Sequence, residues 1–298
     1  MQPRRFRVLV PIDFSEESLR GLDYALDWAL RAPCEIHLVH VVETQSVAPS
    51  VGGQLAHDFV ELERIADVEL RRLVPQQEGR FKIQAIERHI VAGRPAAAIL
   101  RIAARLEVDL IIIGSHGRGR ALSLLFGSVA ERVIHEAVCP VLCVKRGISG
   151  PDMGSPHWDR IVCAVDFSEC SRRAMLAAVD LARHLNVELQ LLHVHQAAAG
   201  IPGRGVEVAS RLAECKQLAE ARGAMKVTTA VVVGSPSAEI VRYVRHDGCD
   251  LLVVGTHGHA APLRLLMGSV AETVMRTASC PVLTVHPGNE ATVARESH

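Results

Sequence analysis

The sequence predicts an α/β protein of two tandem domains, each built on a five-stranded parallel sheet with helices on both faces. Two observations predict this fold class. The second half of the chain repeats the first, and within each half short apolar strands alternate with amphipathic helices. The length of 298 residues also fits two domains of about 150 residues each. Strands that alternate with helices favour right-handed βαβ crossovers and the doubly wound strand order 3-2-1-4-5.

The repeat is visible in two pairs of segments. Residues 8–15, Val-Leu-Val-Pro-Ile-Asp-Phe-Ser, return at 161–168 as Ile-Val-Cys-Ala-Val-Asp-Phe-Ser, an offset of 153. Residues 114–117, Gly-Ser-His-Gly, return at 255–258 as Gly-Thr-His-Gly, an offset of 141. The second half is therefore shorter by 12 residues, which are missing between the positions that match Val41 and Gly93.

The domain boundaries follow from the repeat and from composition. We expect a first domain at 1–146 and a second at 158–298. The linker between them, 147–157, is rich in Gly, Ser and Pro, which favour turns and loops. Residues 46–54, also rich in Ser, Pro and Gly, are expected to form a loop inside the first domain.

The elements of the first half are justified in chain order. Residues 8–12 are a short apolar run with β-branched side chains, as in a strand. The amphipathic stretch 15–32 predicts a helix with Ser15 as its N-cap. Residues 36–42 and 83–91 predict the second and third strands.

Three further elements complete the half. Pro95 suits the first turn of a helix that ends near Leu106. The continuous apolar run 110–113 is typical of a central parallel strand that is covered on both faces. A helix at 128–136 and a last strand at 141–144 follow.

A glycine pattern follows the strand at 110–113. Gly114 and Gly117 are separated by two residues, nine more residues follow, and Gly127-Ser128 then opens a helix. Glycine lets backbone amides approach an anion closely, and the unpaired amides at a helix start favour phosphate. The second half repeats this spacing with Gly255, Gly258, Gly268 and Ser269. The pattern predicts a phosphate-binding loop in each half, with much of the affinity left to the remainder of the ligand.

The serines of this pattern have a second interpretation. Ser128 and Glu131, like Ser269 and Glu272, form the S-x-x-E sequence of a capping box. A helix cap would explain the serines without any ligand, but it would not explain the glycines.

Asp13 and Asp166 each end the first strand of their half, immediately before a helix. In the strand order 3-2-1-4-5, the carboxyl ends of the first and fourth strands flank the switch-point crevice where ligands bind. A carboxylate there can accept hydrogen bonds from a ribose hydroxyl or an adenine amine. Each aspartate could equally cap its own helix, and both interpretations stay open.

These residues resemble the universal stress protein family in its tandem, ATP-binding form, over essentially the whole chain. The resemblance implies a Rossmann-like fold of the adenine nucleotide alpha hydrolase-like type, a role in stress response, and bound ATP (or ADP or AMP) with Mg²⁺ on its phosphates. Asp13 would then lie near the adenosine, and the backbone of Val41 against the adenine. The ribose and phosphates would be held by Gly114, Gly117, Gly127, Ser128 and Val129. The matching positions of the second half are Asp166, Val194, Gly255, Gly258, Gly268, Ser269 and Val270.

Neighbouring side chains distinguish the two expected sites. His116 and His257, inside the glycine loops, could contact the ligand or point to solvent. Arg118 is a further candidate at the phosphate end, but His259 takes its place in the second half. We therefore expect the first site to bind ATP more tightly.

Composition excludes several classes of function. Lys and Arg together number 33, as do Asp and Glu, and aromatic residues make up 3%, so nucleic acid is not an expected partner. No apolar run reaches a membrane span of about 18 residues. The eight cysteines contain no C-x-x-C pair and are expected to be free thiols of a soluble, cytoplasmic protein.

The 15 histidines prompt a metal hypothesis, with His37, His40, His193 and His195 on the second strands of the two halves. No zinc motif accompanies them, so the sequence favours ordinary packed or surface histidines and no metal site. No Walker A sequence and no catalytic triad motif is present.

Three functions stay open: a nucleotide-dependent stress-response regulator with little turnover, a slow ATPase or phosphotransferase, and an interaction module with an empty cleft. The resemblance also implies pairing of the two domains within one chain through 141–144 and 282–285, and it allows a homodimer.

Overall fold

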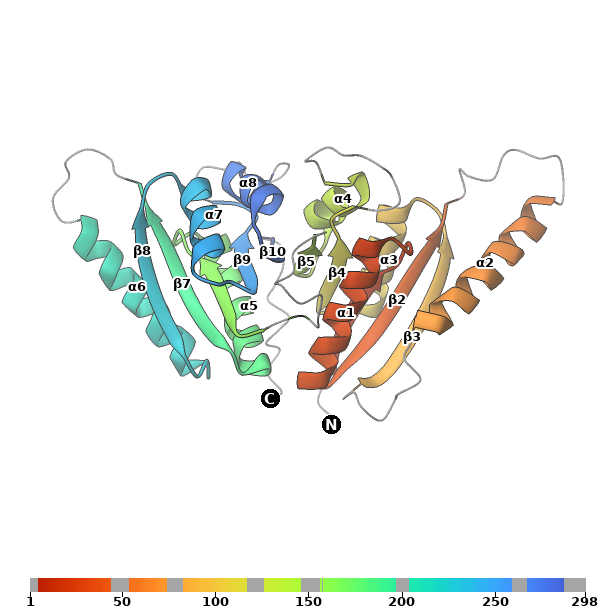
Figure 1. The fold of residues 1–298 in the computed structure, drawn as a ribbon, viewed down its shortest axis with the longest axis horizontal. Coiled ribbons are helices and arrows are strands. Elements are labelled where there is room, and N and C mark those ends of the chain that lie inside the picture. The colour runs from red at the N-terminus through yellow and green to blue at the C-terminus, as the bar shows by residue number, and fades with distance from the viewer. Residues whose placement is uncertain are drawn as a thin grey trace. The chain divides into compact units, whose positions relative to one another are not determined.

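The computed structural model describes residues 5–43, 54–73, 83–116, 126–145, 156, 158–196, 204–258 and 267–286 (Figure 1). The chain divides into two compact units, Met1–Ala137 and Val138–His298. Each unit is an α/β structure in which parallel strands are covered by helices, as predicted.

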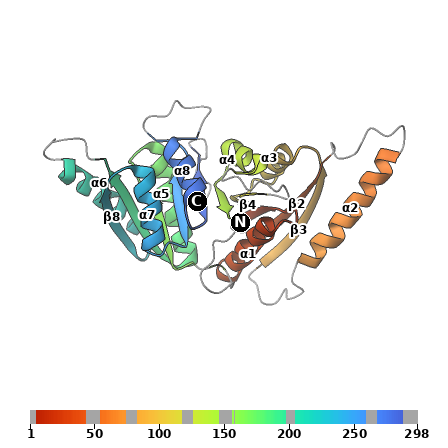
Figure 2. The ribbon, with the colours of Figure 1, turned by 45° about the horizontal axis from the view of Figure 1, so that its top comes forward.

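The sheet of the first unit has the strand order β3-β2-β1-β4, with every pair parallel. Helices α3 and α4 lie side by side on one face of this sheet, and α1 covers the other (Figure 2). Its elements are β1 (Phe6–Pro11), α1 (Glu16–Arg31), β2 (Cys34–Val42), α2 (Gln54–Leu73), β3 (Ile83–Ala92), α3 (Pro95–Leu106), β4 (Leu110–Gly114) and α4 (Ser128–Glu136).

The second unit repeats the arrangement with the parallel order β8-β7-β6-β9-β10. In the numbering of one repeat this is 3-2-1-4-5, so the predicted fold class is confirmed. Its elements are β5 (Val141–Val144), β6 (Arg160–Ala164), α5 (Glu169–Leu185), β7 (Glu188–His195), α6 (Arg204–Ala221), β8 (Val227–Val233), α7 (Pro236–His246), β9 (Leu251–Gly255), α8 (Ser269–Thr277) and β10 (Val282–Val285).

Local sequence signals place the first helices as expected. The hydroxyl of Ser15, the N-cap of α1, accepts a hydrogen bond from the backbone N–H of Ser18 at 3.2 Å. Ser168 does the same for α5. Pro95 and Pro236 each occupy the first turn of their helix, where the missing N–H costs nothing.

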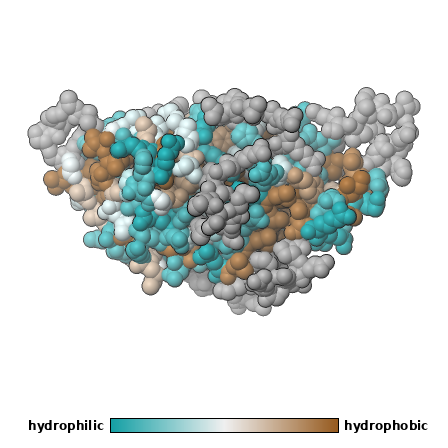
Figure 3. Space-filling model, in the orientation of Figure 1, coloured by the Kyte–Doolittle hydropathy of each residue, from teal (hydrophilic) through white to brown (hydrophobic). Residues whose placement is uncertain are grey.

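Helix α2 was not predicted from the sequence. Among its described side chains only Ala66 and Leu70 are buried, while Leu62 and Ile65 stay exposed. Apolar residues recur at helical spacing through 55–73, so the sequence carried a helix signal that the interpretation of 46–54 as a loop left out. Figure 3 shows hydrophobic residues gathered on the visible surface between α1 and α2.

The interior of each unit is apolar. Every residue of β4 is buried, as the continuous run 110–113 predicted. All eight cysteines are free thiols and six of them are buried, which confirms that part of the sequence analysis. Burial raises the pKa of Cys34 to about 12, so this thiol stays protonated. None of the described helices is long and apolar enough to cross a membrane.

Candidate functional site at the carboxyl ends of the strands

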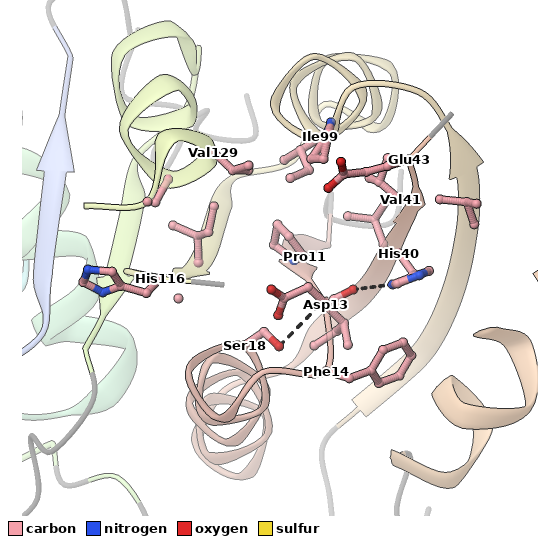
Figure 4. Close-up of a pocket in the computed structure, with 18 of the residues that line it drawn as sticks. Pro11, Asp13, Phe14, Ser18, His40, Val41, Glu43, Ile99, His116 and Val129 are labelled. Carbon is pink, nitrogen blue, oxygen red and sulfur yellow. Dashed lines mark hydrogen bonds between the residues drawn. The ribbon is translucent and has the colours of Figure 1, made fainter. Parts of the chain in front are cut away.

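A cavity of about 830 Å³ lies in the first unit, at the carboxyl ends of β1, β2 and β4 (Figure 4). This is the switch point between β1 and β4, where open α/β sheets bind ligands. The volume falls within the usual range for small-molecule sites. Its floor and rim come from residues 11–14, 39–43, 113–116 and 126–130, and the helices α2 and α3 add Leu62, Ile65, Ala66, Glu69, Pro95 and Ile99.

The structure brings most of the predicted first-half residues together around this cavity. Those that line it are Asp13, Val41, Gly114, His116, Gly127, Ser128 and Val129. Gly117 and Arg118 lie outside the described residues.

Asp13 is fixed by the start of α1. Its Oδ1 accepts hydrogen bonds from the backbone N–H of Ser15 at 3.0 Å and from the Ser15 hydroxyl. The backbone N–H of Asp13 donates to Oγ of Ser18 at 3.4 Å (Figure 4). Because Ser15 is the N-cap, the interpretation of Asp13 as the cap of its own helix is wrong. Asp166 is held in the same way, with Oδ1 accepting from the N–H of Ser168 at 2.9 Å.

His40 and Phe14 line the cavity, although the sequence analysis considered His40 only as a metal ligand or a packed histidine and assigned Phe14 no role. His40 Nδ1 lies 2.7 Å from the carbonyl oxygen of Ile12. Since a carbonyl only accepts, Nδ1 carries a proton and donates it to this oxygen. The rings of His40 and Phe14 are 5.0 Å apart. Both residues recur at the repeat offset, which was a usable signal.

Phe14 has a φ of 64°, in the left-handed region that bulky residues rarely adopt. Phe167 repeats it with a φ of 65°. Its ring lies 4.6 Å from that of His193, whose Nδ1 is 2.7 Å from the carbonyl oxygen of Val165. The same left-handed backbone therefore recurs at the matching position of both halves, directly after Asp13 and Asp166.

The start of α4 brings backbone amides without a helical acceptor to the edge of the cavity. Gly127 is the N-cap, and no side chain caps the helix, so the capping-box interpretation of Ser128 is wrong. The first helical hydrogen bond runs from the N–H of Glu131 to the carbonyl of Gly127 at 3.0 Å. The N–H groups of residues 128–130 precede it and have no helical acceptor. All three of these residues line the cavity.

The same helix start recurs in the second half. Gly268 is the N-cap of α8, again without a side-chain cap, and its N–H donates to the carbonyl of Thr256 at 2.8 Å. Ser269 and Val270 are therefore the first two residues of the helix, as Ser128 and Val129 are in α4.

The glycines divide into two kinds. A Cβ on Gly114 would lie 2.8 Å from Cβ of Glu17 and 2.9 Å from its backbone carbon. Gly255 would meet Cys170 in the same way. These two glycines therefore let the first helix pack on the fourth strand, which is a structural reason for them. Gly258 differs, because its Cβ would lie 2.7 Å from Oδ2 of Asp166, a predicted site residue.

The two loop histidines have different surroundings. His257 is buried, with Nδ1 at 2.9 Å from Oγ1 of Thr256 and its ring edge-on to His286. The interpretation that it points to solvent is wrong. His116 is half-buried and lines the cavity, with Nδ1 at 3.0 Å from Oγ of Ser115.

Charges around the cavity are uneven. Its titratable lining consists of Asp13, His40, Glu43, Glu69 and His116, and no Lys or Arg lines it among the described residues. Within that part of the chain, the positive potential at the α4 end comes from the helix start. In the second half, the guanidinium carbon of Arg211 on α6 lies 4.3 Å from the ring centroid of Phe167, the residue that matches Phe14.

The remaining residues predicted for the second half occupy the corresponding elements. Val194 lies on β7, Gly255 ends β9, and Asp166 follows β6. Burial lowers the pKa of His193 beside them, and the hydrogen bond to the carbonyl of Val165 opposes this only in part.

Two tandem doubly wound α/β units with repeated geometry at the switch point define a Rossmann-like α/β protein. The universal stress protein family matches residues 5–145 and 157–286 of the chain. The chain belongs to this family, and a role in stress response goes with that membership.

Relatives match over most of the chain. A universal stress protein of Mycolicibacterium smegmatis is 27% identical over 299 residues, which covers 95% of this chain and 97% of the relative. A universal stress protein of Mycobacterium tuberculosis is 30% identical over 212 residues, covering 68% and 67%. The crystal structure of a universal stress protein from Archaeoglobus fulgidus superposes with a TM-score of 0.75 at 24% identity, covering 94% of this chain and 98% of that one, and shows the same fold.

Proposed function

We propose that the cavity of the first half binds an adenine nucleotide, with ATP rather than ADP or AMP as the preferred form. The observation that carries this proposal is a single cavity with two different ends. One end offers strand backbone between apolar walls, and the other offers the amides of a helix start.

The β2 end suits adenine. The N–H of Ile12 donates to the carbonyl of Val39 at 2.8 Å, just after β1 ends. Successive residues of a strand turn their backbone groups to opposite sides, so Val41 points its N–H and C=O the same way as Val39. No β1 residue is left to pair with them. An adenine edge, with its donor amine and acceptor ring nitrogen, complements such a pair, while Ile65 and Ile99 supply apolar walls.

The α4 end suits the phosphates. The N–H groups of residues 128–130 can donate to phosphate oxygens, and the helix dipole adds about 0.3–1 kcal/mol. Asp13 lies between the two ends of the cavity, and its carboxylate can accept a hydrogen bond from a ribose hydroxyl. Arg118 would add positive charge at the phosphates, and Mg²⁺ would arrive on the phosphates with most of its waters.

We infer that nucleotide occupancy regulates the protein in the stress response, with little or no turnover. Oδ1 of Asp13 accepts hydrogen bonds from the N–H and the hydroxyl of Ser15, which supports a positioning role for this carboxylate rather than a role as a general base. A slow ATPase or phosphotransferase is the alternative. Timed incubation with ATP and Mg²⁺, with products resolved by chromatography, distinguishes the two, because turnover well above about one per minute indicates an enzyme.

The free thiols fit a reducing compartment, and we propose the cytoplasm. We also propose that the two halves pair within one chain through Val141–Val144 and Val282–Val285, which would cover exposed strand edges. Light scattering on the purified full chain gives its molar mass, which distinguishes a monomer with this internal pairing from a homodimer.

The binding proposal is tested by Ser128→Asp, with Ser269→Asp as the matched variant in the second half. The helix dipole stabilises a carboxylate at the first helical position, so α4 should stay folded. The same carboxylate repels phosphate. Isothermal titration calorimetry of the full chain should show that Ser128→Asp weakens the tighter of the two ATP affinities at least tenfold. Ser269→Asp should leave that affinity unchanged. Equal ATP affinity in Ser128→Asp and the unmodified chain would contradict the proposal.

A further inference from the structure

We propose that the first half holds a zinc-like divalent metal ion between His37, Glu87 and His89, at a site separate from the nucleotide cavity. The three residues lie on the neighbouring strands β2 and β3. Their side chains form a group of possible ligands within the described residues.

The sheet register brings these side chains to one place. His37 of β2 lies opposite Glu87 of β3, and Val39 lies opposite His89. Residues two apart in a strand share a face, so all three side chains project from the same face of the sheet. The sequence analysis considered His37 with His40, but those two are three residues apart on one strand and face opposite ways.

The distances match a metal centre. His37 Nδ1 is 3.2 Å from His89 Nε2 and 3.5 Å from Oε2 of Glu87, and the latter two atoms are 3.8 Å apart. A point equidistant from the three atoms lies about 2.0 Å from each, which is the bond length of zinc to imidazole nitrogen and carboxylate oxygen. The spacing of the three ligand atoms therefore fits one ion bound between them.

A direct N–H···N hydrogen bond between the two rings would account for the 3.2 Å distance alone. It would not account for the carboxylate oxygen, which approaches both nitrogens at once. Nε2 of His37 is buried without a hydrogen-bond partner among the described residues, so this ring meets polar groups only through Nδ1. One ion bound to Nδ1, Nε2 and Oε2 accounts for all three separations.

The three side chains differ in their exposure to solvent. The side chain of His37 is 4% exposed and that of His89 is 14% exposed, whereas Glu87 is 57% exposed. An ion can therefore enter past Glu87 and lose most of its water on reaching the imidazoles, keeping one position open to solvent. Two imidazoles and one carboxylate favour Zn²⁺ or Co²⁺ over Mg²⁺ or Ca²⁺, which prefer oxygen ligands.

The nearby charges are nearly balanced. Glu35 lies close enough to His37 to act on it, as does Arg7, whose guanidinium is paired with Glu35 at 3.2 Å. Arg105 acts on His89. The carboxylate of Glu87 therefore supplies the negative charge that favours an ion at this place.

The second half has the same sheet without the site. The positions that match His37, Glu87 and His89 are Gln190, Thr228 and Ala230, and Gln190 lies opposite Thr228 as His37 lies opposite Glu87. These residues pack in the same register, so they provide substitutions that the fold already accepts. None of the three ligands lines the cavity, and His37 is about 13 Å along β2 from Val41.

The test uses the full chain, stripped with a chelator and titrated with Co²⁺ alone, with visible absorption as the readout. We expect one equivalent with the bands of a histidine-bound Co²⁺ ion, displaced by Zn²⁺. His37→Gln and His89→Ala should each lose this equivalent. His246→Gln, an exposed histidine on α7, is the control and should keep it. The proposal is overturned if His37→Gln and His89→Ala give the same bands and stoichiometry as the unmodified chain, or if the unmodified chain gives none.

Thermal unfolding supplies a second readout that does not depend on the spectrum. Zn²⁺ that binds only the folded state raises Tm, and this rise should occur in the unmodified chain and be absent in Glu87→Thr. Glu87 is exposed, so its replacement leaves the fold intact. Ser128→Asp should retain the Zn²⁺ response, which separates the failure of this site from the failure of the nucleotide proposal. An equal rise of Tm in Glu87→Thr would contradict the metal site.

Discussion

The two halves agree in the framework of the crevice and differ in the side chains around it. Asp13 and Asp166 are held by the same serine turn, and Phe14 and Phe167 share the same left-handed backbone. At the crevice, α6 places the guanidinium of Arg211 over Phe167. Away from the crevice, the first half has a cluster of two histidines and a glutamate on its sheet where the second half has Gln, Thr and Ala. The repeat thus preserves the backbone geometry at the carboxyl ends of the strands, while the side chains of the two halves differ.

The largest expected effect concerns the shared framework. Gly114→Ala should lower the free energy of unfolding of the first half by about 2–3 kcal/mol, because its Cβ would meet backbone atoms of Glu17 that cannot move aside. Urea unfolding measures this loss. Gly255→Ala should cost a similar amount in the second half.

Gly21→Ala is the control for that comparison. Its Cβ would meet its nearest neighbour, on Ile112, at 3.6 Å, an ordinary contact inside a helix. This variant should be neutral or slightly stabilising. If Gly114→Ala unfolded at the same urea concentration as Gly21→Ala, the packing role of Gly114 would be refuted.

Much of the framework could be predicted from sequence because it depends on local chemistry. Ser15 and Pro95 mark helix starts through backbone hydrogen bonding, and the apolar run 110–113 marks a buried strand through its composition. The repeat of the first half in the second then predicted the same strand order for both halves. The placement of Asp13 and Gly127 at the crevice follows from that topology, because strand ends meet at one edge of a parallel sheet.

The rest depended on contacts between strands and on backbone conformation. The cluster of His37 and Glu87 requires the register between β2 and β3, which no spacing along the chain reveals. From the sequence alone, Gly114 could serve either a ligand-binding loop or a close contact with a helix. The close approach of Glu17 shows that it serves the helix contact. Ser128 satisfied the capping-box pattern, yet the helix begins one residue earlier in its hydrogen bonding, with Gly127 as the cap.

A smaller effect separates the two crevices. Arg211→Ala removes the guanidinium over Phe167 and should lower the stability of the second half by about 0.5–1 kcal/mol, the range for an exposed cation–π contact. Arg222→Ala, an exposed arginine just after α6, should change stability less. Chemical denaturation of both variants checks the difference, and equal stabilities would mean that Arg211 does not hold this part of the crevice.

The smallest expected effect is a pH dependence in the second crevice. Burial holds the pKa of His193 below its ordinary value, while the unfolded chain titrates near the usual value of about 6.5. As pH falls through that value, the unfolded state takes up a proton that the folded state resists, so stability decreases toward the lowered pKa of the folded state. Above about pH 7.5 neither state is protonated, and the residue contributes no slope.

His193→Gln should therefore flatten the fall in stability between about pH 7 and pH 5, measured as urea midpoints, without changing the stability at pH 8 by more than the lost hydrogen bond to Val165. His246→Gln, on the exposed end of α7, is the matched control and should keep the slope of the unmodified chain. His37 and His89 also have pKa values lowered by burial, so a residual slope from the first half should persist in both variants. An unchanged slope in His193→Gln would show that the ring can leave the crevice on protonation, and the second crevice would then be looser than its repeated geometry indicates.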